Sequence, residues 1–181
     1  KENFRCVFNG NNYSEEWPIE AGKRGIWRID SGVEALDRLS DPKNTALFSS
    51  MGVMTEEECK ARATVNLEHY KGFCEMEALS MIGMIKQHII PSATKSAPSH
   101  VAGLEAAVGQ LEAKLQAVHA ADGAKAAALE ARELRLEVIE EVRLLCDACE
   151  AAVPAADWTI ATYKELLFLD QTLDANGAAS T

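Results

Sequence analysis

Residues 55–90 read TEEECKARATVNLEHYKGFCEMEALSMIGMIKQHII, the longest helical pattern in the chain. Thr55 and Glu58 have the spacing of a capping box, in which each side chain accepts a hydrogen bond from the other residue's amide. Beyond them, apolar residues recur at steps of three or four, typical of one helix face: Ala63, Leu67, Tyr70, Cys74, Ala78, Met81, Ile85 and Ile89. The pattern predicts a helix to about Ile90. Pro91 should kink or end it, because proline has no amide hydrogen to donate.

A second group of apolar residues widens this stripe. Its members are Phe73, Met76, Leu79 and Ile82. A wide apolar face is typical of a helix with neighbours on several sides. We therefore expect the long helix to be central and buried over much of its circumference. Leu67, Tyr70 and Met81 are the residues of this helix that we expect to matter most structurally.

Three shorter helices are predicted before the long one. Ser14 is expected to cap the first, which should end at Gly25. A second, short helix is expected over 33–39. The third should begin at Pro42, directly after an aspartate cap, and end at Gly52.

A helical hairpin is predicted after the long helix. Residues 92–100 are polar and rich in helix breakers, which predicts a linker. Residues 101–118 carry apolar side chains in a coiled-coil-like rhythm. After a short turn, a second long helix is expected over 124–151. Two such helices form an antiparallel hairpin, which is stable only when it packs on something else.

A last helix is predicted near the end of the chain, capped by Asp157. It carries the densest group of aromatic and large apolar residues: Trp158, Ile160, Tyr163, Leu166, Leu167 and Phe168. Burial of such side chains is favourable, so we expect this helix to fold back on the body of the domain.

These patterns predict an all-α fold: a helical bundle with a long central helix, a protruding antiparallel hairpin and a C-terminal aromatic-rich helix. The chain starts on Lys1 and turns apolar at once, so we expect a piece of a longer protein. The predicted parts are the end of a preceding domain with a junction loop (1–13), a helical body (14–97), the hairpin (98–153), a docking helix (154–175) and a disordered tail (176–181).

The composition is that of a globular protein, with 48% hydrophobic and 25% charged residues among 181. The formal net charge is −10. An acidic surface repels nucleic-acid phosphates and anionic membranes, so we expect neither as a partner. No apolar run approaches the ~20 residues that a membrane span needs.

The five cysteines are an odd number and are scattered, which favours free thiols in a reducing compartment. We expect a cytoplasmic location, or a plastid if the source is an alga. Cys146 and Cys149 form a C-x-x-C pair. A redox pair is favoured at a helix N-terminus, whereas this one lies late in a helix on its apolar face. We interpret the two as small core residues, and a thiol enzyme stays a weaker alternative.

The histidines and two glutamates are the residues that could act as metal ligands or acid–base groups. The four histidines, which lack the spacing of a metal motif, are His69, His88, His100 and His119. Glu75 and Glu77 point about 200° apart on a helix, so they do not form a pair. We expect one of them to face solvent and the other to bind a backbone group or an arginine.

Residues 9–17, NGNNYSEEW, join a loop to a helix start, where phosphate sites sometimes form. The loop has one glycine, and two glutamates occupy the helix start where the anion would lie. A phosphate site is therefore excluded.

The same loop is expected to be structural. Asn9 and Gly10 should form a tight turn. Tyr13 and Trp17 are four residues apart and should pack on one helix face.

Several segments resemble, in order, the C-terminal region of type III glutamine synthetases. They are NFRCVFNGNNYSEEWPIEAGKRG, DPKNTALFSSMGVMTEEE, YKGFCEMEALSMI, IIPSA and, near the end, DWTIATYKELLF. The resemblance covers roughly residues 3–97 and 157–169, whereas 98–156 matches mainly in helical character. Two departures are Gly22, which weakens a helix by about 1 kcal/mol relative to alanine, and Thr159, where the family commonly has proline.

The resemblance implies an enzyme that makes glutamine from glutamate, ammonia and ATP, with Mg or Mn. The family's catalytic motifs lie upstream, so it implies no catalytic, cofactor-binding or metal-binding residue here. Residues 1–13 would be the end of the catalytic domain. The implied partners are that domain and neighbouring subunits of a homo-oligomer, a dodecamer in this family. The alternative is a free-standing helical scaffold or coiled-coil module, whose 101–118 seam would stay exposed.

Overall fold

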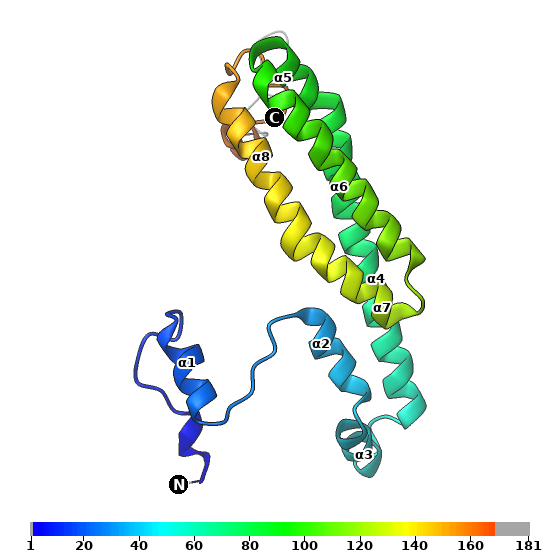
Figure 1. The fold of residues 1–181 in the computed structure, drawn as a ribbon. Coiled ribbons are helices and arrows are strands. Elements are labelled where there is room, and N and C mark those ends of the chain that lie inside the picture. The colour runs from blue at the N-terminus through cyan, green and yellow to red at the C-terminus, as the bar shows by residue number, and fades with distance from the viewer. Residues whose placement is uncertain (1, 169–181) are drawn as a thin grey trace, which may run out of the picture. The chain divides into compact units, whose positions relative to one another are not determined.

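The computed structural model describes residues 2–168 (Figure 1). All regular elements in this range are helices, which confirms the predicted all-α class. The chain divides into two compact units, 1–69 and 70–181, and the division falls inside the long helix α4 (Glu56–Met84). The predicted body at 14–97 is therefore shared between the two units. Within the described range, no helix is both long and apolar enough to cross a membrane.

The first unit contains short helices before α4. They are η1 (Glu2–Cys6), α1 (Glu16–Lys23), α2 (Gly32–Asp37), η2 (Arg38–Ser40) and α3 (Pro42–Ser50). The predicted end signals are confirmed, because Gly25 and Gly52 have φ values of 71° and 66°, a left-handed conformation that favours glycine. Pro42 is the first residue of α3, where its missing amide is not needed.

The start of α1 differs from the prediction. Its N-cap is Glu15 instead of Ser14. The Ser14 hydroxyl and amide both donate to the Asn11 carbonyl, at 2.7 and 3.1 Å. The Asn11 side chain accepts from the Tyr13 amide at 3.0 Å, so an asparagine-based turn precedes the helix. The hydrogen-bonded turn therefore lies two residues after the predicted Asn9–Gly10 turn.

The capping box of α4 is confirmed. The Thr55 amide donates to Glu58 Oε2 at 2.7 Å, and the Glu58 amide donates to Thr55 Oγ1 at 3.2 Å. Two amides at the start of a 29-residue helix thus have partners.

The long helix does not end at Pro91. It continues from α4 through a π-helical segment, η3 (Ile85–Ile89), into α5 (Ile90–Ser96). The Ile90 amide donates to the Ile85 carbonyl five residues back. This wider turn lies directly before Pro91, where an α-helix would lose a hydrogen bond and crowd the proline ring. The linker predicted over 92–100 is consequently wrong for its helical first half.

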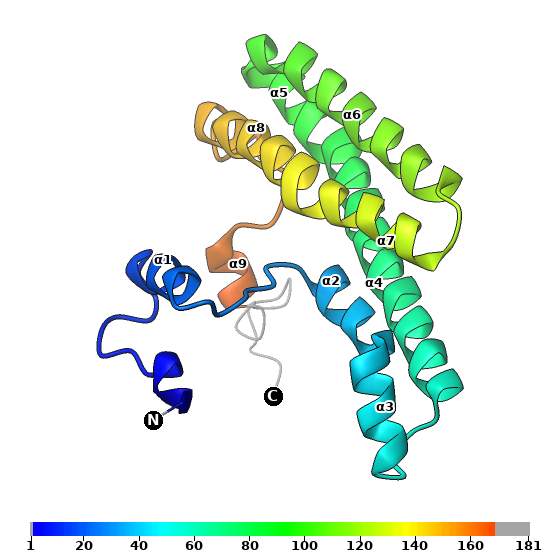
Figure 2. The same ribbon diagram turned by 60° about the horizontal axis from the view of Figure 1, so that its bottom comes forward.

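The second unit is a three-helix bundle. A short turn, η4 (Pro98–His100), leads into the second helix, α6 (Val101–Ala120). The third helix consists of three consecutive segments: α7 (Ala124–Glu133), the π-helical η5 (Leu134–Val138) and α8 (Ile139–Ala152). In both views α6 and α8 run along the later part of α4 and α5 (Figures 1 and 2). Gly123, at φ 86°, makes the turn between the two hairpin helices.

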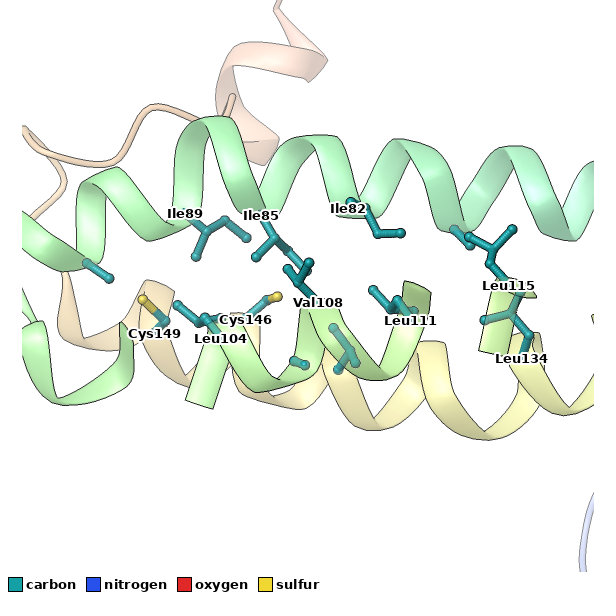
Figure 3. Packing of buried hydrophobic residues seen from close by; sticks show 14 of the residues in the cluster. Ile82, Ile85, Ile89, Leu104, Val108, Leu111, Leu115, Leu134, Cys146 and Cys149 are labelled. Carbon is teal, nitrogen blue, oxygen red and sulfur yellow. The ribbon is translucent and has the colours of Figure 1, made fainter. Parts of the chain in front are cut away.

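The predicted hairpin is present, but it does not protrude. Its apolar faces share one core with α4, η3 and α5, and labelled side chains from all three long helices meet in Figure 3. Leu104, Leu111 and Val118 of the 101–118 seam are buried in this core. The alternative of a scaffold with an exposed seam is therefore wrong.

The two π-helical segments keep the buried residues in line. Buried positions in the first long helix are four residues apart at Ile85, Ile89 and Ala93. In a regular α-helix each step of four drifts by about 40°, so such a run would leave the core. A π-turn holds more residues than an α-turn and offsets this drift. In the third long helix, Leu134 begins η5 and Val142 lies eight residues further on, which is two steps of four, and both are buried.

The final helix is shorter and begins later than predicted. It is α9 (Tyr163–Leu167), and a second capping box starts it: the Thr162 amide donates to Glu165 Oε2 at 2.7 Å. The Glu165 amide donates to Thr162 Oγ1 at 3.3 Å. Asp157 is therefore not the cap. Residues 169–175 of the predicted docking helix and the tail at 176–181 lie outside the described residues.

Replacing Thr55 with alanine should lower the free energy of unfolding by about 1 kcal/mol, because it removes a cap acceptor. Urea denaturation of the full chain followed by circular dichroism measures this. Thr64→Ala, at an exposed position inside α4, is the control and should be neutral or slightly stabilising. Equal midpoints for the two variants would contradict the role of the box.

Candidate functional site

The segment after α8 docks on the bundle through polar anchors. The Asp157 carboxylate accepts hydrogen bonds from the Lys95 ammonium and the Ser96 hydroxyl. Nδ1 of His88 lies 3.0 Å from Oγ1 of Thr159. The bond from Lys95, followed by that from Ser96, lowers the pKa of Asp157 below its usual range. These contacts fix the segment on η3 and α5.

Trp158 and Ile160 are half-buried and pack against the core, but they lie in the stretch before α9 and not in the helix that was predicted to dock. Together with η3 and α8 they line an open pocket of about 280 Å³ to which Met81 also contributes. Phe168 is 48% exposed, so its expected burial does not occur. The side chain of Tyr163 lies outside the described part of the chain.

The C-x-x-C cysteines are core residues, as predicted. Cys146 and Cys149 are both buried. Burial, with a smaller effect of Asp147, raises the pKa of the Cys146 thiol to about 11. Burial alone raises the pKa of Cys149. A thiol with a raised pKa is a poor nucleophile at neutral pH, which argues against the thiol-enzyme alternative.

The two glutamates have different partners, an arginine and a histidine. Glu77 Oε2 lies 3.1 Å from Arg135 Nε. Glu77 is therefore the glutamate that binds an arginine, as was predicted for one of the two. Glu75 Oε1 lies 2.5 Å from Nε2 of His119, so Glu75 does not simply face solvent. Among residues 2–168 no three His, Cys, Asp or Glu side chains are arranged to hold a metal ion.

The junction loop packs differently from the prediction. Trp17 stacks on Phe8 with ring centroids 4.8 Å apart, and the Arg24 guanidinium lies 5.8 Å from the Trp17 ring. Tyr13 is fully exposed. The predicted Tyr13–Trp17 contact is wrong because Tyr13 precedes the first helical residue, so helical i, i+4 spacing does not apply.

Gly10 has a steric role instead of a turn role. A Cβ at this position would lie 2.5 Å from the Phe8 ring, which in turn stacks on Trp17. Asn9 is exposed. In the long helix, Leu67 is buried, and Tyr70 is half-buried against the core beside Cys74.

One apolar surface of the second unit faces away from the core. Phe73, Met76 and Leu79 are 48%, 55% and 56% exposed, so the expected burial of α4 around its circumference is wrong. Gly72 and Gly83 continue the 4-3-4 spacing of Met76 and Leu79 along the same helix face. Among the described residues, a Cβ at either glycine would have no atom within 4 Å outside its own stretch of helix backbone. We call Gly72, Phe73, Met76, Leu79 and Gly83 the outer face of α4.

Only Cys6 of the five thiols should react rapidly with a chromogenic disulfide in the native chain, because it is exposed and the other four are buried. Counting the thiols released before and after addition of urea measures this. A second fast native thiol that Cys146→Ser removes would restore the thiol-enzyme alternative.

Asp157→Asn should lower the melting temperature at pH 7, because the carboxylate loses its bonds from Lys95 and Ser96. The folded-state pKa of Asp157 is lowered, so its contribution is present above the usual value of 3.8 and lost as the pH falls through the lower value. The difference from wild type should therefore shrink at the most acid pH. Asp122→Asn, in the exposed turn after α6, is the control; a pH-independent difference at Asp157 would contradict the assignment.

Comparisons of the sequence with known proteins point to one family. The family model described as "Glutamine synthetase C-terminal domain" matches residues 1–106. A glutamine synthetase of Butyrivibrio fibrisolvens is 33% identical over 85 residues, which are 47% of this chain and 12% of that protein. The type-3 glutamine synthetase of Dictyostelium discoideum is 31% identical over 91 residues, or 50% of this chain and 12% of its own length.

A glutamine synthetase of Bacteroides fragilis is 34% identical over 86 residues, 48% of this chain and again 12% of the relative. The matched part is thus a small fraction of each relative's length. The family model matches more than half of the 181 residues. The chain therefore belongs to the glutamine synthetase C-terminal domain family.

Proposed function

We propose that this chain is the helical C-terminal domain of a type III glutamine synthetase and has a structural role in that enzyme. In this proposal the outer face of α4 docks on the catalytic part of the enzyme, which lies outside this chain. The full-length enzyme makes glutamine from glutamate, ammonia and ATP.

The exposed apolar side chains of the outer face carry the proposal. Met76 and Leu79 are each more than half exposed at the centre of a regular helix, and glycines flank them. Helical glycines cost about 1 kcal/mol each relative to alanine, and among residues 2–168 no atom of another element lies close enough to require them. Small residues beside large apolar ones allow another backbone to approach closely. The matched relatives are about eight times longer than the matched segment, so in those relatives most of the polypeptide lies outside this domain and could cover such a face.

Catalysis is assigned to the rest of the enzyme. No metal-binding cluster is formed within residues 2–168, and the buried thiols are poor nucleophiles. We propose that ATP and Mg or Mn bind outside this chain. Contacts with neighbouring subunits of a homo-oligomer and a cytoplasmic location stay predictions.

Combined Met76→Lys and Leu79→Lys substitutions should destabilise the docked state of the full-length enzyme. Each buried apolar side chain of this size stabilises an interface by about 1.5–3 kcal/mol. We expect a lower melting temperature and a loss of glutamine formation in the full-length enzyme. The isolated 181-residue chain should melt as wild type, since both positions are exposed in it.

Leu144→Lys is the matched control, because Leu144 is an exposed leucine on α8 outside the outer face. It should leave the full-length enzyme unchanged. A Met76/Leu79 variant that is as stable and active as the Leu144 control in the full-length enzyme would refute the docking proposal.

A further inference from the structure

The second unit contains an open pocket whose wall is rich in aromatic and sulfur atoms, and we call it the Trp158 pocket. It has a volume of about 280 Å³ and lies between α4, η3, α8 and the segment that leads into α9. Most of its wall is apolar and includes Met81, Met84, Ile89, Trp158, Ile160 and Leu166. A concave, mostly apolar wall with a few polar groups is typical of small-molecule sites.

The chain segment that carries Trp158 is held at both ends before any ligand binds. The Asp157 carboxylate, directly before it, accepts hydrogen bonds from two side chains of α5. After it, the Thr162 amide and hydroxyl donate to the Glu165 carboxylate at 2.7 and 2.8 Å. A ligand therefore does not have to order this wall, and that favours binding because ordering a segment costs free energy.

The rim of the pocket carries one uncompensated negative charge. Arg143 and Asp147 both line the pocket and pair with each other, with Arg143 Nε 3.3 Å from Asp147 Oδ1. Glu150 also lines the pocket, one helical turn further along α8, and within residues 2–168 no cation pairs with it. The rim should therefore attract a cation and repel an anion, although exposed charges interact only weakly.

The wall below this rim favours an aromatic ring. Aromatic rings pack well against an indole, and thioether sulfurs make favourable contacts with ring edges. Trp158 supplies the indole, and Met81 and Met84 supply two thioethers. The face of an indole also attracts a cation. The lining thus suits a molecule that combines a ring with a positive charge.

We infer that the Trp158 pocket binds an arylalkylammonium ligand, a small molecule with an aromatic ring and a protonated amine. The ring lies against Trp158 and the two methionines, and the ammonium group lies at the rim beside Glu150. All groups in this site belong to the second unit. The inference is therefore independent of the docking proposed for the outer face of α4.

Titration of the full 181-residue chain at neutral pH, followed by NMR, tests this with three probes of similar size and different charge. They are 2-phenylethylammonium, 2-phenylethanol and 3-phenylpropionate. The chain has three tryptophans, and the Trp158→Phe variant identifies the indole N–H signal of Trp158. We expect 2-phenylethylammonium to shift this signal saturably at millimolar concentration. It should bind up to about fivefold more tightly than the neutral alcohol, and the anion should bind most weakly.

Two variants test the two parts of the site separately. Ala161 is exposed and lines the pocket, so Ala161→Phe should fill the space and weaken the binding of all three probes by about tenfold or more. Glu150→Gln should weaken only 2-phenylethylammonium, to the affinity of the alcohol. Glu141→Gln is the matched control, because Glu141 is an exposed carboxylate about 180° away from Glu150 on α8. It should bind all three probes as wild type does.

Absence of a saturable shift of the Trp158 signal at millimolar concentration would overturn the inference. Equal affinities for the three probes, or unchanged binding in the Ala161→Phe variant, would also overturn it. An equal loss in the Glu141→Gln variant would show attraction to the acidic chain as a whole and would contradict the role of Glu150. Melting curves of each variant separate loss of binding from loss of folding.

Discussion

The second unit depends on the burial of one face of the helix that runs from α4 through η3 into α5. Ile82, Ile85 and Ile89 of this face meet Leu104, Val108 and Leu111 of α6, and Cys146 and Cys149 of α8 complete the core (Figure 3). None of the three helices can bury its apolar face alone, and isolated helices are only marginally stable in water. The hairpin therefore needs this face, and the polar anchors of Asp157 in turn need the hairpin to place them beside α5.

Signals that act within a few residues were predictable from the sequence. The Thr55–Glu58 box, Pro42 at the start of α3, and the glycines that end α1 and α3 all work through local backbone hydrogen bonds. Predictions that depended on distant neighbours were less accurate. Pro91 was predicted to kink or end the helix, and the sequence gives no signal for the π-turn that precedes it. The outer face of α4 looked buried because the sequence shows an apolar face without showing what covers it.

The sites were harder to predict than the helices. Thr162 and Glu165 have the same spacing as the box at α4, so the sequence contains the signal for this cap, although the prediction placed it at Asp157. The stacking of Trp17 on Phe8 joins residues nine positions apart across a loop, which no periodic pattern records. A cavity in the first unit is lined by residues 27–29 together with residues of η2 and the start of α3, and only the fold brings these segments together.

The two π-turns also bear on how sequences of this family should be aligned. Each π-turn adds one residue to a helix without changing the side chains that face the core on either side of it. A homologue with a regular α-turn in place of η3 or η5 would be one residue shorter at that point and could retain the same bundle. A single-residue gap in the middle of an apparently continuous helix is then a structurally silent deletion. Alignments that forbid gaps within helices would shift every core position beyond it.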